Sequence, residues 1–197
     1  MPKGIPITEL ELCCRRHEIF DAALHLFLEK GFNEISVREI AEASGMGKSS
    51  LYNYFKTKDE ILLWYIEDEL KNVNTAAREI ANQPIPVIER LRQIMRKNLD
   101  FLVASKELYL KLFFEVQRLT IQSQKRVQAG RHAYQDLVRQ LIEDGIRDGT
   151  FRPVNSLLVA RLMITAMTPT VLTSRPTGSP ENMLENVFDI ILHGIQA

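Results

Sequence analysis

The chain has 197 residues, of which 45% are hydrophobic and 25% charged, proportions typical of a soluble globular protein. Its 25 basic and 25 acidic residues give a net charge of zero, which argues against a protein that coats nucleic acid without regard to sequence. No uninterrupted apolar stretch reaches membrane-spanning length and no signal-peptide core is present, so we expect a cytoplasmic protein.

Hydrophobic periodicity predicts helices along the whole chain, and no segment alternates convincingly as a strand. Capping boxes at Thr8 and Ser36 begin the first two predicted helices, and Gly31 ends the first of them. A short turn at 44–46 separates the second helix from a third over 47–55.

A long helix is predicted over 58–81, and the prolines that follow it break the chain. Five further helices are predicted over 86–104, 106–118, 121–148, 155–172 and 181–194. The expected fold is therefore all-α with about nine helices. A three-helix domain over 1–58 is joined by the long helix to a larger helical domain over 59–197.

The second and third helices, with a three-residue turn between them, are predicted to form a helix-turn-helix. Gly45 permits the tight turn, while Ala41 and Leu51 are expected to hold the two helices together. The outer face of the third helix can then enter a major groove. That face carries Lys48, Ser49, Tyr52 and Asn53, and residues 44–58 include three lysines and no acidic side chain.

The segment 15–66 resembles the N-terminal domain of TetR/AcrR-type transcriptional repressors. Its most diagnostic part is the pattern Leu-Tyr-x-Tyr-Phe-x-x-Lys over 51–58, and it differs from many members at Gly47, where serine is common. The resemblance implies a sequence-specific DNA-binding regulator. It further implies a repressor that a small molecule, bound in the C-terminal domain, releases from a palindromic operator.

Together, the outer-face positions and the resemblance indicate DNA contacts at Ser36, Arg38, Lys48, Ser49, Ser50, Tyr52, Asn53, Tyr54 and Lys58. By the resemblance, Lys48 would read a base, Arg38 would reach a base edge or the backbone, and Lys58 would bind phosphate. Plain packing is the alternative role for the two tyrosines.

The resemblance implies a ligand-binding and dimerisation domain beyond about residue 82. Candidate pocket residues are Trp64, Met95, Phe101, Tyr109, Phe113, Phe114, Tyr134 and Met163. The alternative is an ordinary core, which the helical spacing of Phe101, Leu108, Leu112 and Val116 favours for any single one of these residues. An apolar or amphipathic effector is expected.

The last two predicted helices have apolar faces wider than packing on one side requires. This pattern favours a homodimer in which two helices from each chain form a four-helix bundle. The candidate interface residues are Leu158, Leu162, Val187, Phe188 and Ile191. The two DNA-binding domains of such a dimer would match the two half-sites of a palindromic operator.

The sequence motifs support neither an enzymatic function nor a cofactor. Gly-Lys-Ser at 47–49 matches the end of a phosphate-binding loop, but Glu42 stands where that motif needs glycine and a helix precedes it. The four histidines lack metal-ligand spacing. Cys13 and Cys14 are expected to be ordinary helix residues, with a redox pair as the alternative. A constitutive architectural DNA binder without an effector is the alternative function.

Overall fold

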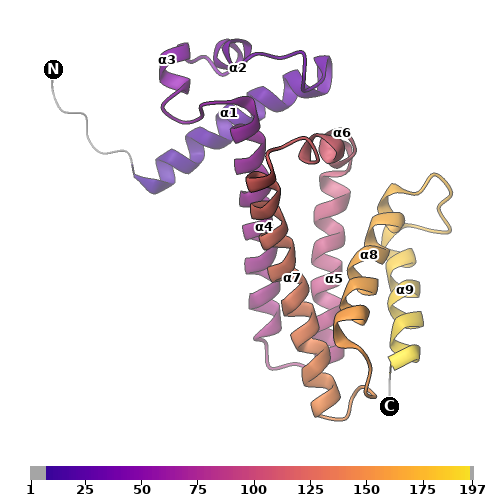
Figure 1. Cartoon of the computed structure of the whole chain (residues 1–197). Helices are drawn as coiled ribbons and strands as arrows, with labels where there is room; N and C mark the ends of the chain where they lie inside the picture. Colours follow the sequence, from indigo (N-terminus) through magenta and orange to yellow (C-terminus); the bar gives the residue numbers. More distant parts are fainter. Residues whose placement is uncertain (1–7, 196–197) are drawn as a thin grey trace. The chain divides into compact units, whose positions relative to one another are not determined.

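A computed structural model describes residues 8–195 of the chain, apart from the side chains of 111–114. This range contains nine helices and no strand (Figure 1). They are α1 (Glu9–Lys30), α2 (Val37–Ala43), α3 (Lys48–Leu51), α4 (Lys58–Ala81), α5 (Val87–Ala104), α6 (Lys106–Val116), α7 (Ile121–Arg147), α8 (Ser156–Leu172) and α9 (Pro180–Ile195). The predicted all-helical fold is confirmed.

None of the described helices is both long enough and apolar enough to cross a bilayer.

The chain divides into two compact units. The first comprises the residues up to Asp68 together with Lys111–Gln124, and the second comprises Glu69–Leu110 and the residues from Lys125 onward. The long helices α4 and α7 each contribute to both units. Each unit has its own buried core and is described separately.

In the first unit, local side-chain caps set where the helices begin. Thr8 and Glu11 form the predicted capping box of α1, and Ser36 and Glu39 form that of α2. Each box satisfies two backbone N–H groups that a helix start would otherwise leave unpaired. At the start of α4, the Glu60 amide donates to Thr57 Oγ1 at 3.1 Å, which satisfies one more N–H group of this kind.

The third helix is shorter than predicted. Regular α-helix covers only Lys48–Leu51. The Asn53 amide then donates to the Ser50 carbonyl at 3.1 Å and the Tyr54 amide to the Leu51 carbonyl at 2.8 Å. These tighter i to i+3 bonds end the regular helix. The Phe55 amide still donates to the Leu51 carbonyl at 3.1 Å, so Phe55 keeps the helical spacing from Leu51 and is buried as well. The ends of the other predicted helices beyond residue 58 differ from the observed ones by at most two residues.

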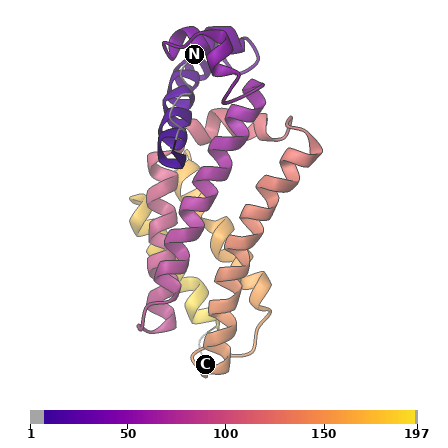
Figure 2. The ribbon, with the colours of Figure 1, turned by 90° about the vertical axis from the view of Figure 1, so that its left-hand side faces the viewer.

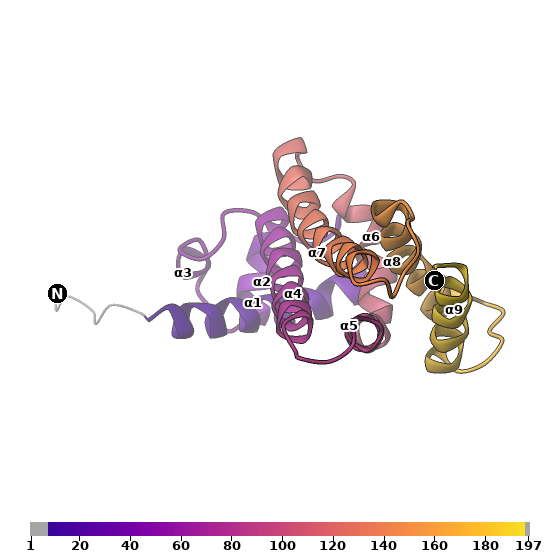
Figure 3. The ribbon, with the colours of Figure 1, turned by 90° about the horizontal axis from the view of Figure 1, so that it is seen from below.

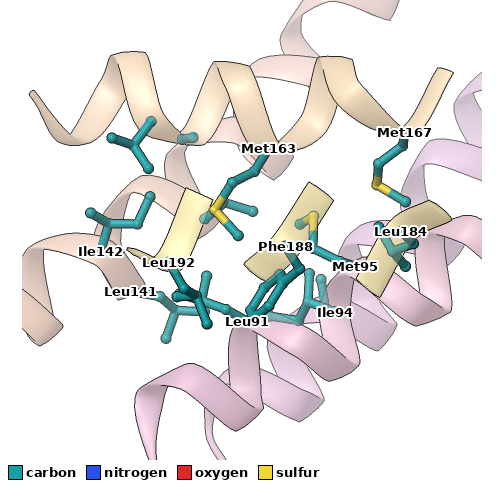
Figure 4. Packing of buried hydrophobic residues seen from close by; sticks show 14 of the residues in the cluster. Leu91, Ile94, Met95, Leu141, Ile142, Met163, Met167, Leu184, Phe188 and Leu192 are labelled. Carbon is teal, nitrogen blue, oxygen red and sulfur yellow. The ribbon is translucent and has the colours of Figure 1, made fainter. Parts of the chain in front are cut away.

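In the second unit, α5, α7, α8 and α9 enclose the main apolar core. Figure 1 shows α8 and α9 running antiparallel on either side of the loop at 173–179, and Figure 3 shows them next to α5. The longest of the described helices is α7, with 27 residues, and its full length is visible in Figure 2 in the orange part of the colour scale. Figure 4 shows the side chains that converge: Leu91, Ile94, Met95, Leu141, Ile142, Met163, Met167, Leu184, Phe188 and Leu192.

Gly145, in the last turn of α7, makes room for a buried aromatic ring. A Cβ atom at this position would lie 2.4 Å from Cδ2 of Phe151, whose side chain is almost fully buried. Such a distance is far below van der Waals contact, and the ring is held by the surrounding core. Only glycine therefore fits without displacing Phe151.

We expect Gly145→Ala to lower the free energy of unfolding by about 1–3 kcal/mol, because overpacking a dense core forces neighbouring groups out of place. Urea denaturation followed by circular dichroism measures the change. Gly194→Ala is the matched control, since it lies in α9 and a Cβ atom added there would have nothing within 4 Å. A loss of stability that is equal in the two variants would contradict this account.

Candidate nucleic-acid interface

The start of α2 is held by reciprocal hydrogen bonds. Ser36 Oγ accepts from the Glu39 amide at 3.2 Å, and the Glu39 carboxylate accepts from the Ser36 amide at 2.9 Å. Lys30 Nζ also donates to this carboxylate at 3.1 Å. The Ser36 amide first and Lys30 next lower the pKa of Glu39 to about 2, so the box stays charged at neutral pH.

The turn between α2 and α3 is fixed by a left-handed glycine and a backbone bond. Gly45 has φ of +67°, a conformation that costs a residue with a Cβ free energy. The Met46 amide donates to the Ala41 carbonyl at 2.8 Å. The side chains of Ala41 and Leu51 are fully buried, in agreement with their predicted packing role. Gly47 caps α3 without a side-chain bond.

Polar side chains occupy the outer surface of α3. Lys48, Ser49, Ser50 and Asn53 are exposed, while Tyr52 is half-buried with its ring 5.8 Å from Lys48 Nζ. Hydroxyl, amide and ammonium groups of this kind bind base edges and phosphates. One side of α3 therefore carries hydrogen-bond donors and acceptors, while Leu51 holds the opposite side against the core. Tyr54 is half-buried as well.

Arg38 lies on α2 and forms an ion pair with Glu42, one turn further along the same helix. Its Nε atom donates to Glu42 Oε1 at 2.8 Å, and this bond, with the negative charge of Glu42, raises the pKa of the guanidinium. Both side chains are exposed, so the pair contributes little to stability. A planar guanidinium can also bind phosphate or a base edge, so Arg38 stays a candidate for the predicted contact with DNA.

Lys58 has partners that the sequence did not reveal. Its ammonium donates to the carbonyls of Phe32, Asn33 and Ile35 at 2.7, 2.8 and 3.1 Å, and lies 4.9 Å from the centre of the Phe32 ring. An ammonium has three N–H donors, so these carbonyls use all of them. Lys58 thus ties the start of α4 to the loop between α1 and α2. Phosphate binding by this residue stays a prediction.

Trp64, which we expected in an effector pocket, packs within the first unit. Its ring lies edge-on to His17 at 4.8 Å and to Phe55 at 5.8 Å. His17 Nε2 also lies 3.2 Å from Asp68 Oδ2. These contacts join α1, the end of the helix-turn-helix and α4. Helical periodicity could identify an apolar side of α4 but not the elements that cover it.

The other candidate pocket residues separate into four groups. Phe101 and Tyr134 line a cavity of about 130 Å³ in the second unit. Met95 and Met163 are buried in the main core (Figure 4), and Tyr109 on α6 does not line the cavity. The side chains of Phe113 and Phe114 lie outside the described residues.

The candidate interface residues also differ in exposure. Leu158 and Leu162 on α8 are each 53% exposed, and Val187 and Ile191 on α9 are half-buried. Phe188 is only 2% exposed and packs under the Arg92 guanidinium, 4.6 Å from its ring centre. The structure therefore assigns Phe188 to the core of its own chain, because the apolar side of α9 is wide enough to cover that core as well.

Other chemistry suggested by single residue types lacks a matching arrangement. Among the described residues, no group of three His, Cys, Asp or Glu side chains is placed to hold a metal ion. Cys13 and Cys14 form no disulfide. The Gly-Lys-Ser sequence at 47–49 follows helix α2 rather than a strand, unlike a phosphate-binding loop.

Comparison with known proteins gives the same architecture over nearly the whole chain. The family model for bacterial regulatory proteins of the tetR family matches residues 19–63, and a tetracyclin repressor-like C-terminal domain model matches residues 84–195. The transcriptional repressor KstR2 of Rhodococcus jostii (strain RHA1) is 27% identical over 189 residues, covering 92% of this chain and 91% of that protein.

Two solved structures illustrate the likeness. The TetR family regulator PfmR from Thermus thermophilus has a TM-score of 0.73 and 26% identity, over 91% of this chain and 99% of that one. The regulator FadR from Bacillus subtilis, in complex with stearoyl-CoA, has a TM-score of 0.77 and 19% identity, over 91% and 99%. This chain therefore belongs to the TetR family of bacterial regulatory proteins, and it is a DNA-binding transcriptional regulator of the helix-turn-helix type.

Proposed function

We propose that the protein is a repressor that binds a palindromic operator as a homodimer and is released by a small molecule. Residues 1–58 would form the DNA-binding domain, and residues 59–197 the effector and dimerisation domain. The observation that carries the proposal is the surface of α3, where exposed polar side chains surround Lys48 while Leu51 and Phe55 are buried. A rigid anchor beneath an exposed polar surface favours direct readout of bases.

Three further observations support the effector and the dimer. The R. jostii relative is a repressor, and the B. subtilis neighbour was solved with stearoyl-CoA, an amphipathic molecule. The second unit contains the cavity lined by Phe101 and Tyr134, within the domain assigned to the effector. Leu158 and Leu162 leave apolar surface exposed on α8, which association of two chains would bury.

Lys48→Ala tests sequence-specific binding. We expect it to weaken binding to DNA selected from a random pool by about 1–3 kcal/mol, because a lysine contact to a guanine edge is lost. Binding to random DNA should change much less. Fluorescence anisotropy on both DNAs, over a range of salt concentrations, measures the two affinities.

Lys56→Ala is the matched control, since Lys56 lies in the same segment but its ammonium donates to the Tyr52 carbonyl. It should reduce binding to both DNAs alike and only slightly. If Lys48→Ala lowers both affinities equally, Lys48 contacts the backbone. If the unmodified protein binds selected and random DNA equally, the proposal fails and a binder that does not read sequence is favoured.

A further inference from the structure

Tyr134 on α7 carries a buried hydroxyl that makes no well-formed hydrogen bond within the fold. The residue is 5% exposed, and among the described residues the amide of Asn98 interacts with its hydroxyl but not at the geometry of a full hydrogen bond. Buried polar groups in proteins are nearly always paired, and leaving one unpaired costs stability. Tyr134 also lines the cavity of the second unit. A hydroxyl without a well-formed hydrogen bond, beside an open space, indicates a partner that enters from outside.

The hydroxyl is a neutral donor. Burial raises the pKa of Tyr134 far above its usual value, and the weak hydrogen-bond interaction with the Asn98 side chain offsets this only in part. A raised pKa means that the proton stays on the oxygen throughout the physiological range. The group can therefore donate a hydrogen bond to a ligand, and it presents no negative charge.

Asn98 on α5 supplies a second neutral donor to the same cavity. Its Nδ2 atom donates to the thioether sulfur of Met167 at 3.4 Å, and a thioether is a weak acceptor. A stronger acceptor in the cavity would compete successfully for this amide. A carbonyl oxygen has two lone pairs, so it can accept from the hydroxyl and from the amide together.

The rest of the cavity restricts the size and the charge of the ligand. Most of the lining is apolar, with Val73, Ala76, Ala77, Ile94 and Phe101. The volume of about 130 Å³ is close to that of a cavity known to hold one benzene, ~150 Å³. Lys97 and Glu69 also line it, so the charged groups at the cavity are one of each sign. An ionised ligand group would gain little from such a pair after losing its water.

We propose that this cavity binds an apolar molecule through a neutral carbonyl oxygen, which accepts hydrogen bonds from Tyr134 Oη and Asn98 Nδ2. The proposal rests on the proposed function and names the chemistry of its effector. A ketone and an ester share this chemistry. Hydrocarbons lack the acceptor, and carboxylates add a charge.

Three probes of similar size test the proposal on the DNA-free, full-length protein: acetophenone, ethylbenzene and benzoate. Calorimetric titration gives each dissociation constant. We expect acetophenone to bind more tightly than the other two, and Tyr134→Phe to weaken it about tenfold, since the ring remains and one hydrogen bond is lost. Asn98→Leu should weaken it in the same direction. Ethylbenzene binding should be the same in all variants.

Tyr109→Phe is the matched control, because Tyr109 does not line the cavity and the substitution removes the same atom. It should leave acetophenone binding unchanged. Tyr134→Phe is expected to melt no lower than the unmodified protein, because the hydroxyl it removes makes no well-formed hydrogen bond in the fold. A thermal melt of each variant therefore shows whether weaker binding comes from the lost donor or from a loss of structure.

Three results would overturn the proposal. The first is equal affinity for acetophenone and ethylbenzene. The second is a higher affinity for benzoate than for acetophenone that is lost in Lys97→Met. The third is no binding of acetophenone up to millimolar concentration. None of these measurements contains DNA. A protein that still selects specific DNA but gives one of these results refutes the ligand chemistry and leaves the proposed regulatory function intact.

Discussion

Replacing Leu158 and Leu162 together by glutamate is expected to give a folded monomer that has lost high-affinity binding to its operator. The two side chains lie four residues apart, so they share one side of α8, and each is more than half exposed. Ile190 on α9 adds an apolar side chain that is 72% exposed. Glutamates at such positions would be buried without partners in a dimer but solvated in a monomer.

The loss of affinity follows from the number of DNA-binding domains in the complex. In a dimer, the second DNA-binding domain binds its half-site at a high effective concentration, and losing it lowers the affinity for DNA about 10²–10⁴-fold. Sedimentation equilibrium gives the oligomeric state, and anisotropy on the selected DNA gives the affinity. Ile121→Glu serves as the control, because Ile121 is 74% exposed but belongs to the first unit, whereas α8 and α9 belong to the second.

A monomeric unmodified protein at micromolar concentration would contradict this account. Substitution of Phe188, another candidate interface residue, would not test the dimer by itself. Because Phe188 is buried in its own chain, a charge there would unfold the second unit as well as disturb any interface. The exposed leucines separate these two effects.

Lys58→Met should destabilise the first unit by about 2–3 kcal/mol, as expected for hydrogen bonds to a charged donor when the carbonyls become unpaired. Methionine retains much of the apolar stem, so the change mainly removes the ammonium. Three carbonyls, those of Phe32, Asn33 and Ile35, lose the donor together. DNA affinity should fall on all sequences alike, because the link between α4 and the loop before α2 is loosened.

Trp64 provides the measurement. It is the only tryptophan of the chain and packs beside Phe55 in the first unit, so its fluorescence during urea denaturation reports the unfolding of that unit. Lys56→Met is the control, because Lys56 is exposed and its ammonium bonds a single carbonyl. Unchanged stability with a salt slope reduced by about one unit would instead assign Lys58 to a phosphate.

The sequence by itself determined the local features of this protein. The capping boxes at Thr8 and Ser36 join residues three apart, so their geometry is contained in a single turn of chain. The left-handed conformation of Gly45 is also a local feature, and so is the helical periodicity that buries Leu51 and exposes Lys48. Periodicity distinguishes the apolar side of a helix from its polar side without knowledge of any neighbour.

Only the tertiary structure decided which neighbour each apolar or polar group meets. The carbonyls bound by Lys58 lie 23 to 26 residues earlier in the chain. Trp64, Met95 and Phe188 were all recognisable as candidates for burial, but whether each lines a pocket, a core or an interface depends on helices far away in sequence. Helical periodicity gives the direction of a side chain about its own axis, and the packing of distant helices determines what covers it.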